Sequence, residues 1–259
     1  MKFFSLILAL LTACGEAPPA GNEAVAAPPA AESPARPFVA VEKNQLVEFR
    51  YAWSAEAAAV PGLVERFRID MDRLKRELEA GAEEDRSFRE REGIEFHGHM
   101  AAIDHQTAGQ SGQLLSLLTE RSSYTGGAHG AFTIGSILWD RLAAREIRPA
   151  ELFAAPANMD RLLTQRWCDA LNAAREEKRG QPAGEGGIFD DCPSLDDIAI
   201  IPADSDGNRR FEKLLLMASP YVAGPWAEGS YEIELAVTPE LVAGIRKEYR
   251  GGFEIAQTQ

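Results

Sequence analysis

The spacing of apolar residues predicts two amphipathic helices. Pro61 opens the first, and its apolar residues recur at intervals of four and three positions, as one face of a helix requires: Leu63, Phe67, Met71, Leu74 and Leu78. We expect it to run to about Glu79, with Gly81 as the stop. The second is predicted over residues 157–178, with one apolar face made of Met159, Leu163, Trp167, Leu171 and Ala174.

Alternating or short apolar runs predict strands between and after these helices. The predicted strands are 39–53, 95–105, 113–124, 131–140, 198–201, 211–218 and 231–237. Pro149 to Phe153 predicts one helical turn, and Thr238 with Pro239 predicts the capped start of a last helix. The pattern predicts an α+β fold of antiparallel sheets with packed amphipathic helices. We expect two α+β sub-domains, 38–154 and 155–259.

The first residues predict export. The apolar run from Phe3 to Leu11 is far shorter than the roughly 20 residues of a membrane-spanning helix. Leu11-Thr12-Ala13-Cys14 resembles the lipobox of bacterial lipoproteins, which implies a signal peptide over 1–13 and a lipidated Cys14. Gly15 does not match the Asp that usually retains lipoproteins at the inner membrane, so the resemblance favours an outer-membrane anchor facing the periplasm. The alternative is an ordinary secretory signal with a chance cysteine.

Composition and charge narrow the possible partners. Residues 14–37 are mostly Ala, Pro, Glu and Gly, which predicts an extended tether without a core. The net charge of −13 argues against nucleic acid and favours cationic partners. The alternative is that the acidic surface serves solubility alone.

Cys168 and Cys192 are the cysteines that follow Cys14. In an oxidising compartment they form a natural pair, and a disulfide between them would close a loop of about 25 residues. Two inert thiols or a metal-binding pair are the alternatives.

Several segments resemble paired bacterial extracytoplasmic domains of uncharacterised function. These domains occur in the ectodomain of a lysozyme-sensing anti-sigma factor and ahead of the catalytic domain of some peptidoglycan deacetylases. The similar segments are Tyr124 to Gly130, Leu138 to Asp140 with Glu151 to Phe153, Pro220 to Gly229, and Tyr231 to Val237 with its capped helix. The resemblance implies an α+β binding platform without catalytic residues of its own. This chain shows no deacetylase domain and no sigma-binding segment, so those roles are not carried over whole.

Two glycine-rich loops hold the candidate ligand-binding residues: Tyr124, Gly126, Gly127 and His129 in the first, and Tyr221, Trp226 and Glu228 in the second. Loops on rigid scaffolds often carry binding function, and Trp226 could stack on a sugar or anchor a protein. The structural alternatives are a tight turn at Gly126-Gly127, which we favour for that turn, and a tryptophan that fills the core.

The other groups of candidate metal-binding or catalytic residues do not predict a metal site or an active site. His97, His99 and His105 share strand parity and His129 lies on a nearby turn, but no fourth zinc ligand is evident, so we expect no metal. Asp204 to Asn208 resembles half a calcium loop, although a hairpin turn already explains these residues. We find no nucleophile elbow, phosphate loop or dinucleotide fingerprint, and we expect no cofactor.

These observations lead to a non-catalytic binding module of the cell envelope. Its expected partner is a lysozyme-like cationic protein or peptidoglycan, and the acidic charge favours the protein. One alternative is a peptidoglycan-acting hydrolase with a site around His97, His99 and His129. Another is a structural lipoprotein that helps to assemble an envelope complex.

Overall fold

The computed structural model describes residues 35–182 and 187–256. The predicted signal peptide, Cys14 with its predicted lipid anchor, and nearly all of the predicted tether lie outside the described residues. The chain from Pro34 onward forms one compact unit. Among the described residues, no helix is long and apolar enough to cross a membrane.

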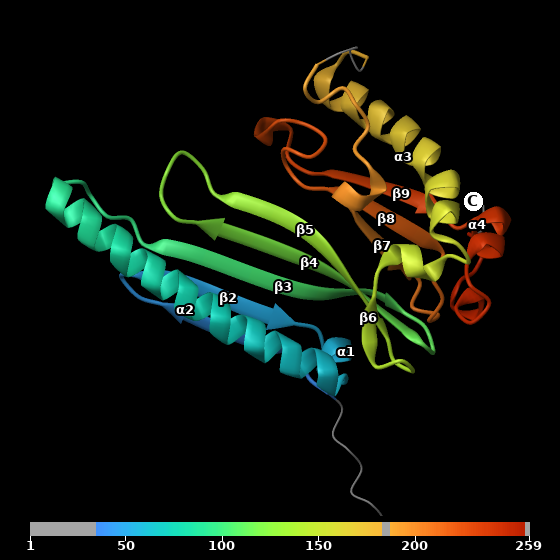
Figure 1. Ribbon diagram of the computed structural model, residues 1–259, viewed down its shortest axis with the longest axis horizontal. Coiled ribbons are helices and arrows are strands. Elements are labelled where there is room, and N and C mark those ends of the chain that lie inside the picture. Colours follow the sequence, from blue (N-terminus) through green and yellow to red (C-terminus); the bar gives the residue numbers. More distant parts are fainter. Residues whose placement is uncertain (1–34, 183–186, 257–259) are drawn as a thin grey trace, which may run out of the picture. The chain divides into compact units, whose positions relative to one another are not determined.

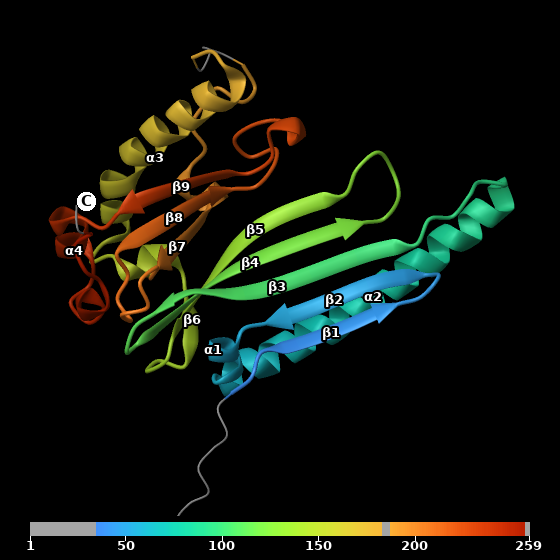
Figure 2. The ribbon, with the colours of Figure 1, turned by 180° about the vertical axis from the view of Figure 1, so that it is seen from behind.

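A six-stranded sheet forms the larger part of this unit, and its strands follow one another in chain order (Figure 1). They are β1 (Phe38–Lys43), β2 (Val47–Trp53), β3 (His99–Gln110), β4 (Leu114–Tyr124), β5 (Ala131–Asp140) and β6 (Arg145–Ile147). Figure 2 shows β1 at the outer edge of this sheet, beside β2.

The single strand predicted over 39–53 is wrong, because the structure divides it into β1 and β2. The side-chain oxygen of Asn44 accepts hydrogen bonds from the N–H groups of Leu46 and Val47, at 2.8 and 2.9 Å. Asn favours turns because its short polar side chain can bond nearby backbone groups. Asn44 therefore reverses the chain, and β1 pairs with β2 as an antiparallel hairpin.

Helix α2 (Pro61–Glu92) is longer than predicted and follows the short helix α1 (Ala55–Ala58). Gly81 does not end it, because Ala82 is fully buried and Arg86 and Arg89 pair with Glu83 and Asp85 in the turns beyond. The helix ends at Gly93, whose φ of 67° is the left-handed conformation that glycine adopts at helix ends.

The α2 crossover makes β3 run parallel to β2, whereas the other pairs of both sheets are antiparallel. A long helical connection returns the chain to the starting end of the previous strand, which is how parallel neighbours arise. The predicted antiparallel pairing is therefore confirmed for the named strands except this pair. The strand predicted over 95–105 also begins and ends later, at His99 and Gln110.

A three-stranded antiparallel sheet forms the C-terminal part. Its elements are α3 (Pro156–Arg179), β7 (Ala199–Ala203), β8 (Lys213–Ala218), β9 (Tyr231–Ala236) and α4 (Pro239–Gly244). Short 3₁₀ turns join the regular elements: η1 (Pro149–Leu152), η2 (Leu195–Asp197), η3 (Trp226–Glu228) and η4 (Arg250–Gly252). Thr238 caps α4 by accepting the N–H of Leu241, as predicted.

The elements stack in the order α2, large sheet, small sheet, α3 (Figure 1). One core, which includes Phe49, Phe67 and Leu117, lies between α2 and the large sheet. A small cluster with Leu118 and Ile134 joins the opposite face of that sheet to β7 and β8. The α+β prediction is confirmed.

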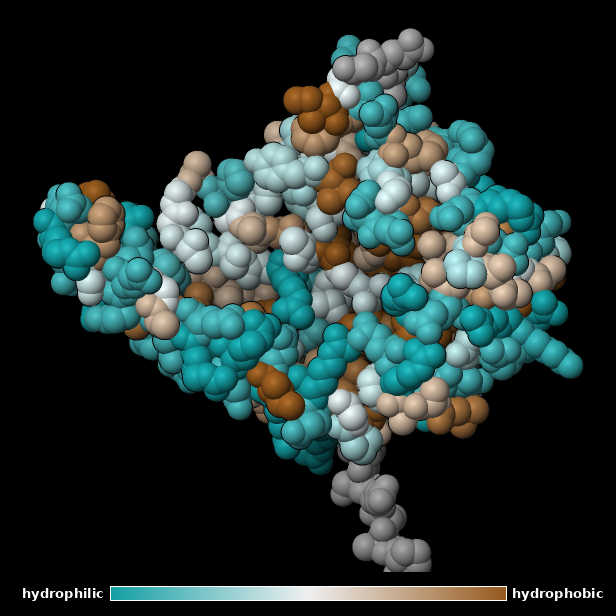
Figure 3. All heavy atoms as spheres, in the orientation of Figure 1, coloured by the Kyte–Doolittle hydropathy of each residue, from teal (hydrophilic) through white to brown (hydrophobic). Residues whose placement is uncertain are grey.

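The largest core fills the space around α3 and the small sheet, and it includes Leu114 and Leu138 from the large sheet. In Figure 3, hydrophilic residues dominate the surface of α2, and apolar residues gather mainly between the large-sheet part and the C-terminal elements. The division into two sub-domains at 154/155 stays a prediction.

Candidate functional site

The turn between β4 and β5 has the tight geometry that its glycines allow. Gly126 and Gly127 have φ values of 92° and 106°, where residues with a side chain are strained. The Tyr124 hydroxyl donates to the carbonyl oxygen of Gly127 at 3.1 Å. A Cβ on Gly130 would lie 2.6 Å from the carbonyl oxygen of Ser123. The tight turn predicted at Gly126-Gly127 is therefore confirmed.

His129, in the same turn, is exposed and its tautomer is fixed by its partners. Its Nδ1 lies 2.8 Å from the carbonyl oxygen of Gly130, which can only accept, so Nδ1 carries the proton. Nε2 is then an acceptor, and the Tyr221 hydroxyl donates to it at 3.2 Å.

Trp226 completes a group of rings that we call the aromatic cluster: His129, Tyr221 and Trp226. The imidazole of His129 stacks on Trp226, with ring centroids 4.5 Å apart and planes 13° apart. The Tyr221 ring lies 6.1 Å from Trp226 and 6.2 Å from His129. The structure thus brings together side chains from the β4–β5 turn and the β8–β9 connection.

Tyr221 presents its ring from an unusual backbone position. Its φ is 70°, in the left-handed region that costs a residue with a Cβ about 1–2 kcal/mol. Its N–H donates to the carbonyl oxygen of Gly224 at 2.9 Å, which closes the loop. The residue is 54% exposed. Strained backbone that carries an exposed aromatic residue is a reason to suspect function.

Glu228 lies next to the aromatic cluster in sequence, and both of its carboxylate oxygens accept hydrogen bonds. Arg179 donates to both carboxylate oxygens, at 2.9 and 3.1 Å, and the Tyr231 hydroxyl donates to one of them. Burial by itself would raise the pKa of Glu228, but the hydrogen bonds from Arg179 and Tyr231 outweigh it and hold the pKa below its ordinary value. Lys178 donates to the carbonyl oxygens of Glu228 and Ser230. Glu228 thus fastens η3, and with it Trp226, to the end of α3.

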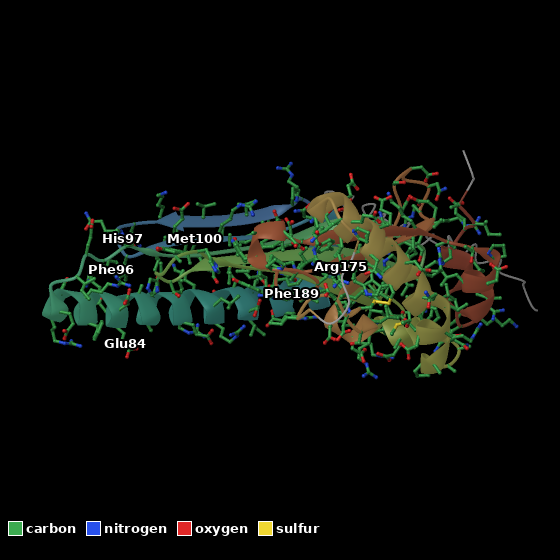
Figure 4. All side chains as sticks on the ribbon, turned by 90° about the horizontal axis from the view of Figure 1, so that it is seen from above. Glu84, Phe96, His97, Met100, Arg175 and Phe189 are labelled. Carbon is green, nitrogen blue, oxygen red and sulfur yellow. A yellow bond between two sulfur atoms is a disulfide. The ribbon has the colours of Figure 1, made fainter. Side chains whose placement is uncertain are left out.

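Arg175 fastens the other side of the same region and is fully buried. Its five N–H groups donate to the carbonyl oxygens of Ala223, Asp190 and Asp191 and to the side chain of Asn172. Figure 4 shows Arg175 in the C-terminal part of the molecule, where the disulfide also lies. The guanidinium therefore holds the loop of Tyr221 against α3.

The predicted disulfide between Cys168 and Cys192 is confirmed, with Cα atoms 5.5 Å apart. It joins α3 to the segment before η2, close in sequence to the carbonyl groups that Arg175 binds. Two rigid connections, one covalent and one of hydrogen bonds, thus support the aromatic cluster.

The histidines do not assemble into a zinc or hydrolase site. His97 is exposed and precedes β3, and Figure 4 shows it in the opposite part of the molecule from Arg175. His99 is buried and its Nε2 lies 3.2 Å from Asp85, whereas His129 belongs to the aromatic cluster. The predicted shared face is correct for His99 and His105, both of which are buried.

Within residues 35–182 and 187–256, one cluster of acidic side chains has the spacing of metal ligands. Asp204, Asp206 and Glu212 offer oxygens within 4.8 Å of one another in the β7–β8 turn. Asp204 already accepts the N–H groups of Gly207 and Arg209, and Asp206 accepts that of Asn208. These bonds shape the hairpin that the sequence predicted, and we assign no metal to it.

The supporting residues Arg175 and Arg179 were not predicted from the sequence. Arg175 lies four positions after Leu171, on the apolar face of the predicted helix. A charged residue on an apolar face must be buried with partners, since an unpaired buried charge is costly. The place of Arg175 on the apolar helix face was therefore the sequence signal that could have identified it as a buried, partnered residue.

No protein-family model matches the sequence, and no curated protein is significantly similar to it. The solved structures that match this chain include the following two. A DUF3298 family protein from Pseudomonas aeruginosa PAO1 has 15% identity and a TM-score of 0.50, over 84% of this chain and 97% of the other. A DUF3298 family member from Bacteroides fragilis NCTC 9343 has 15% identity and a TM-score of 0.47, over 83% and 95%.

At this level of identity the likeness concerns the fold. The resemblance to an anti-sigma factor ectodomain and to peptidoglycan deacetylases is not confirmed by these two structures. The chain has the α+β fold of the Pseudomonas DUF3298 protein.

Proposed function

We propose that this protein is a non-catalytic binding module of the cell envelope, anchored through Cys14, and that the aromatic cluster is its contact site for a cationic protein of the lysozyme type. The observation that carries the proposal is the aromatic cluster itself. Tyr and Trp dominate binding energy at protein interfaces because they bury a large area at low entropic cost. Their ring faces also attract the cationic groups of Arg and Lys.

Charge favours a cationic partner over the cell wall. The net charge of −13 would attract a basic protein over a distance and repel anionic polymers. Peptidoglycan remains the second candidate, because a sugar ring can stack on Trp226. The hydrolase alternative has less support, since His99 lies beside Asp85 whereas His129 contacts Tyr221 and Trp226.

The salt dependence of the binding affinity distinguishes a specific contact surface from simple charge attraction. The chain from Pro34 to Gln259 would be tested for binding to immobilised lysozyme at 20 mM and 150 mM salt. We expect saturable binding at both, weaker by less than about tenfold at the higher salt, because ring contacts are not screened. Binding that vanishes at 150 mM would leave only charge attraction. Purified peptidoglycan in the same assay tests the second candidate.

A further inference from the structure

A pocket of about 450 Å³ lies between α2 and the large sheet. Its wall includes Arg66, Asp70 and Arg73 from α2, Arg121 from β4 and Ile137 from β5. Helix α2 packs chiefly on β2 and β3, which leaves this part of the sheet face accessible. The small sheet covers the opposite face, so the pocket is separate from the aromatic cluster. Its volume is within the range of about 300–1,000 Å³ that small-molecule sites occupy.

The deep side of the pocket is a continuous chain of hydrogen bonds. The Tyr51 hydroxyl donates to Asp70 at 3.0 Å, so the neighbouring Nε2 of His105, also at 3.0 Å, must donate to Tyr51. Nδ1 of His105 then accepts from the Thr119 hydroxyl at 2.8 Å. Tyr51 and His105 are almost fully buried, and Phe67 stacks on the imidazole with centroids 4.0 Å apart. This chain fixes the position of Asp70.

The fixed carboxylate arranges the arginines around it. Arg73 donates to Asp70 at 2.6 Å and to Glu77 at 2.8 Å, and Arg66 pairs with Glu146. Arg121 contacts Asp70 through a single nitrogen at 3.3 Å. Among the described residues, the rest of its guanidinium has no hydrogen-bond partner. A planar guanidinium with donors to spare matches a carboxylate or phosphate group.

The pocket wall also contains apolar side chains beside its charged ones, which include Glu65. Ile69 of α2, which is 61% exposed, and Ile137 of β5 both line the pocket. An isoleucine this exposed beside a cationic group offers a surface for the apolar part of a ligand.

We propose that this pocket binds a small organic anion, whose carboxylate or phosphate group contacts Arg121 and whose apolar part lies against Ile69 and Ile137. The site goes beyond the proposed partner-binding function and does not depend on it. It uses a different face of the sheet and a different chemistry.

The fluorescent probe 8-anilinonaphthalene-1-sulfonate, which joins an anionic group to an apolar body, tests the site on the chain from Pro34 to Gln259. We expect saturable binding of one probe molecule. Arg121→Gln should weaken it about tenfold, because a charge-assisted hydrogen bond is lost. Arg50→Gln is the matched control, because Arg50 has the same 41% side-chain exposure, pairs with Asp104 at 3.1 Å and lies on the other face of the sheet. It should leave affinity unchanged.

A second pair of variants keeps the test decisive if Arg121→Gln fails to fold. Ile69→Glu places a negative charge in the pocket wall and should abolish probe binding, whereas Leu142→Glu, at a residue 80% exposed outside the pocket, should not. Displacement of the probe by N-acetylmuramic acid would identify a carboxylate ligand, and displacement by glycerol 3-phosphate a phosphate ligand. Displacement by neither, or equal affinity in Ile69→Glu and Leu142→Glu, would overturn the proposal.

Discussion

The hydroxyl of Tyr221 lies 3.2 Å from Nε2 of His129, although the two residues are 92 positions apart in the chain. This contact joins the tip of a hairpin of the large sheet to a loop of the small sheet. Tyr221 and Trp226, on the small-sheet side, are held from behind by Arg175, Glu228 and the disulfide. A site held in this way loses little conformational entropy when it binds, which favours affinity.

Replacing Tyr221 by glycine should separate binding from stability. Glycine adopts a φ of 70° without strain, whereas alanine does not. We therefore expect Tyr221→Gly to be more stable than Tyr221→Ala by about 1 kcal/mol in urea unfolding. Both variants should lose lysozyme affinity equally, because both lack the ring. An alanine variant as stable as the glycine variant would show that the backbone at this position is not strained.

The buried His105 should make stability fall as the pH is lowered. Burial, helped by the nearby positive charge of Arg121, lowers the pKa of His105 from 6.5 to about 3. Above pH 6.5 both the folded and unfolded forms hold a neutral imidazole. Below pH 6.5 the unfolded chain takes up a proton that the folded chain does not, so stability is lost progressively between pH 6.5 and pH 3.

Unfolding in urea at pH 7 and pH 5 measures this loss. The single imidazole should contribute a decrease of about 2 kcal/mol. His105→Asn should remove that part of the pH dependence, whereas His129→Ala should retain it because His129 is exposed. Equal pH dependence in wild type and His105→Asn would contradict the assignment.

The disulfide should contribute substantially to stability. Cys168 and Cys192 are 24 positions apart, and closing a loop of this size restricts the unfolded chain. The double variant Cys168→Ala, Cys192→Ala should lose about 3 kcal/mol in free energy of unfolding. Wild type measured in a reducing agent should lose a similar amount. An unchanged unfolding midpoint after complete reduction would contradict this expectation.

Arg175 should be among the most sensitive positions in the C-terminal part. Methionine at this position would leave the carbonyl oxygens of Ala223, Asp190 and Asp191 without these donors. We expect Arg175→Met to lose about 3 kcal/mol or more in thermal or urea unfolding, because buried unsatisfied polar groups are costly. Arg161→Gln, at an exposed position of the same helix, should change stability by less than about 0.5 kcal/mol.

The local pattern of apolar and polar residues predicted much of the fold. The strand over 131–140 and the helix around Leu163 and Trp167 follow directly from their apolar periodicity. The length of α2 could not be read in this way, because Gly81 is a local stop signal. Burial of Ala82 against the sheet and ion pairs beyond it outweigh that signal. Propensity is a weak guide where tertiary packing opposes it.

The candidate site was predicted in part. Tyr221, Trp226 and His129 were selected from two separate loops, but their contact depends on how the two sheets pack, which no local pattern encodes. The pocket beside Arg121 was missed for the same reason, since its walls come from α2, β4 and β5. Arg175 carried a local signal, as a charged residue on an apolar helix face.

Binding to immobilised lysozyme at 150 mM salt, with Trp226→Ala compared against Phe88→Ala, tests the central claim most directly. Phe88 is a matched control because it is an aromatic residue 49% exposed on α2, a helix that contributes no residue to the aromatic cluster. We predict that Trp226→Ala weakens binding at least about tenfold, as loss of a central aromatic contact does. Phe88→Ala should bind as wild type does. Equal binding by both variants, with both folded, would contradict the assignment of the aromatic cluster as the contact site.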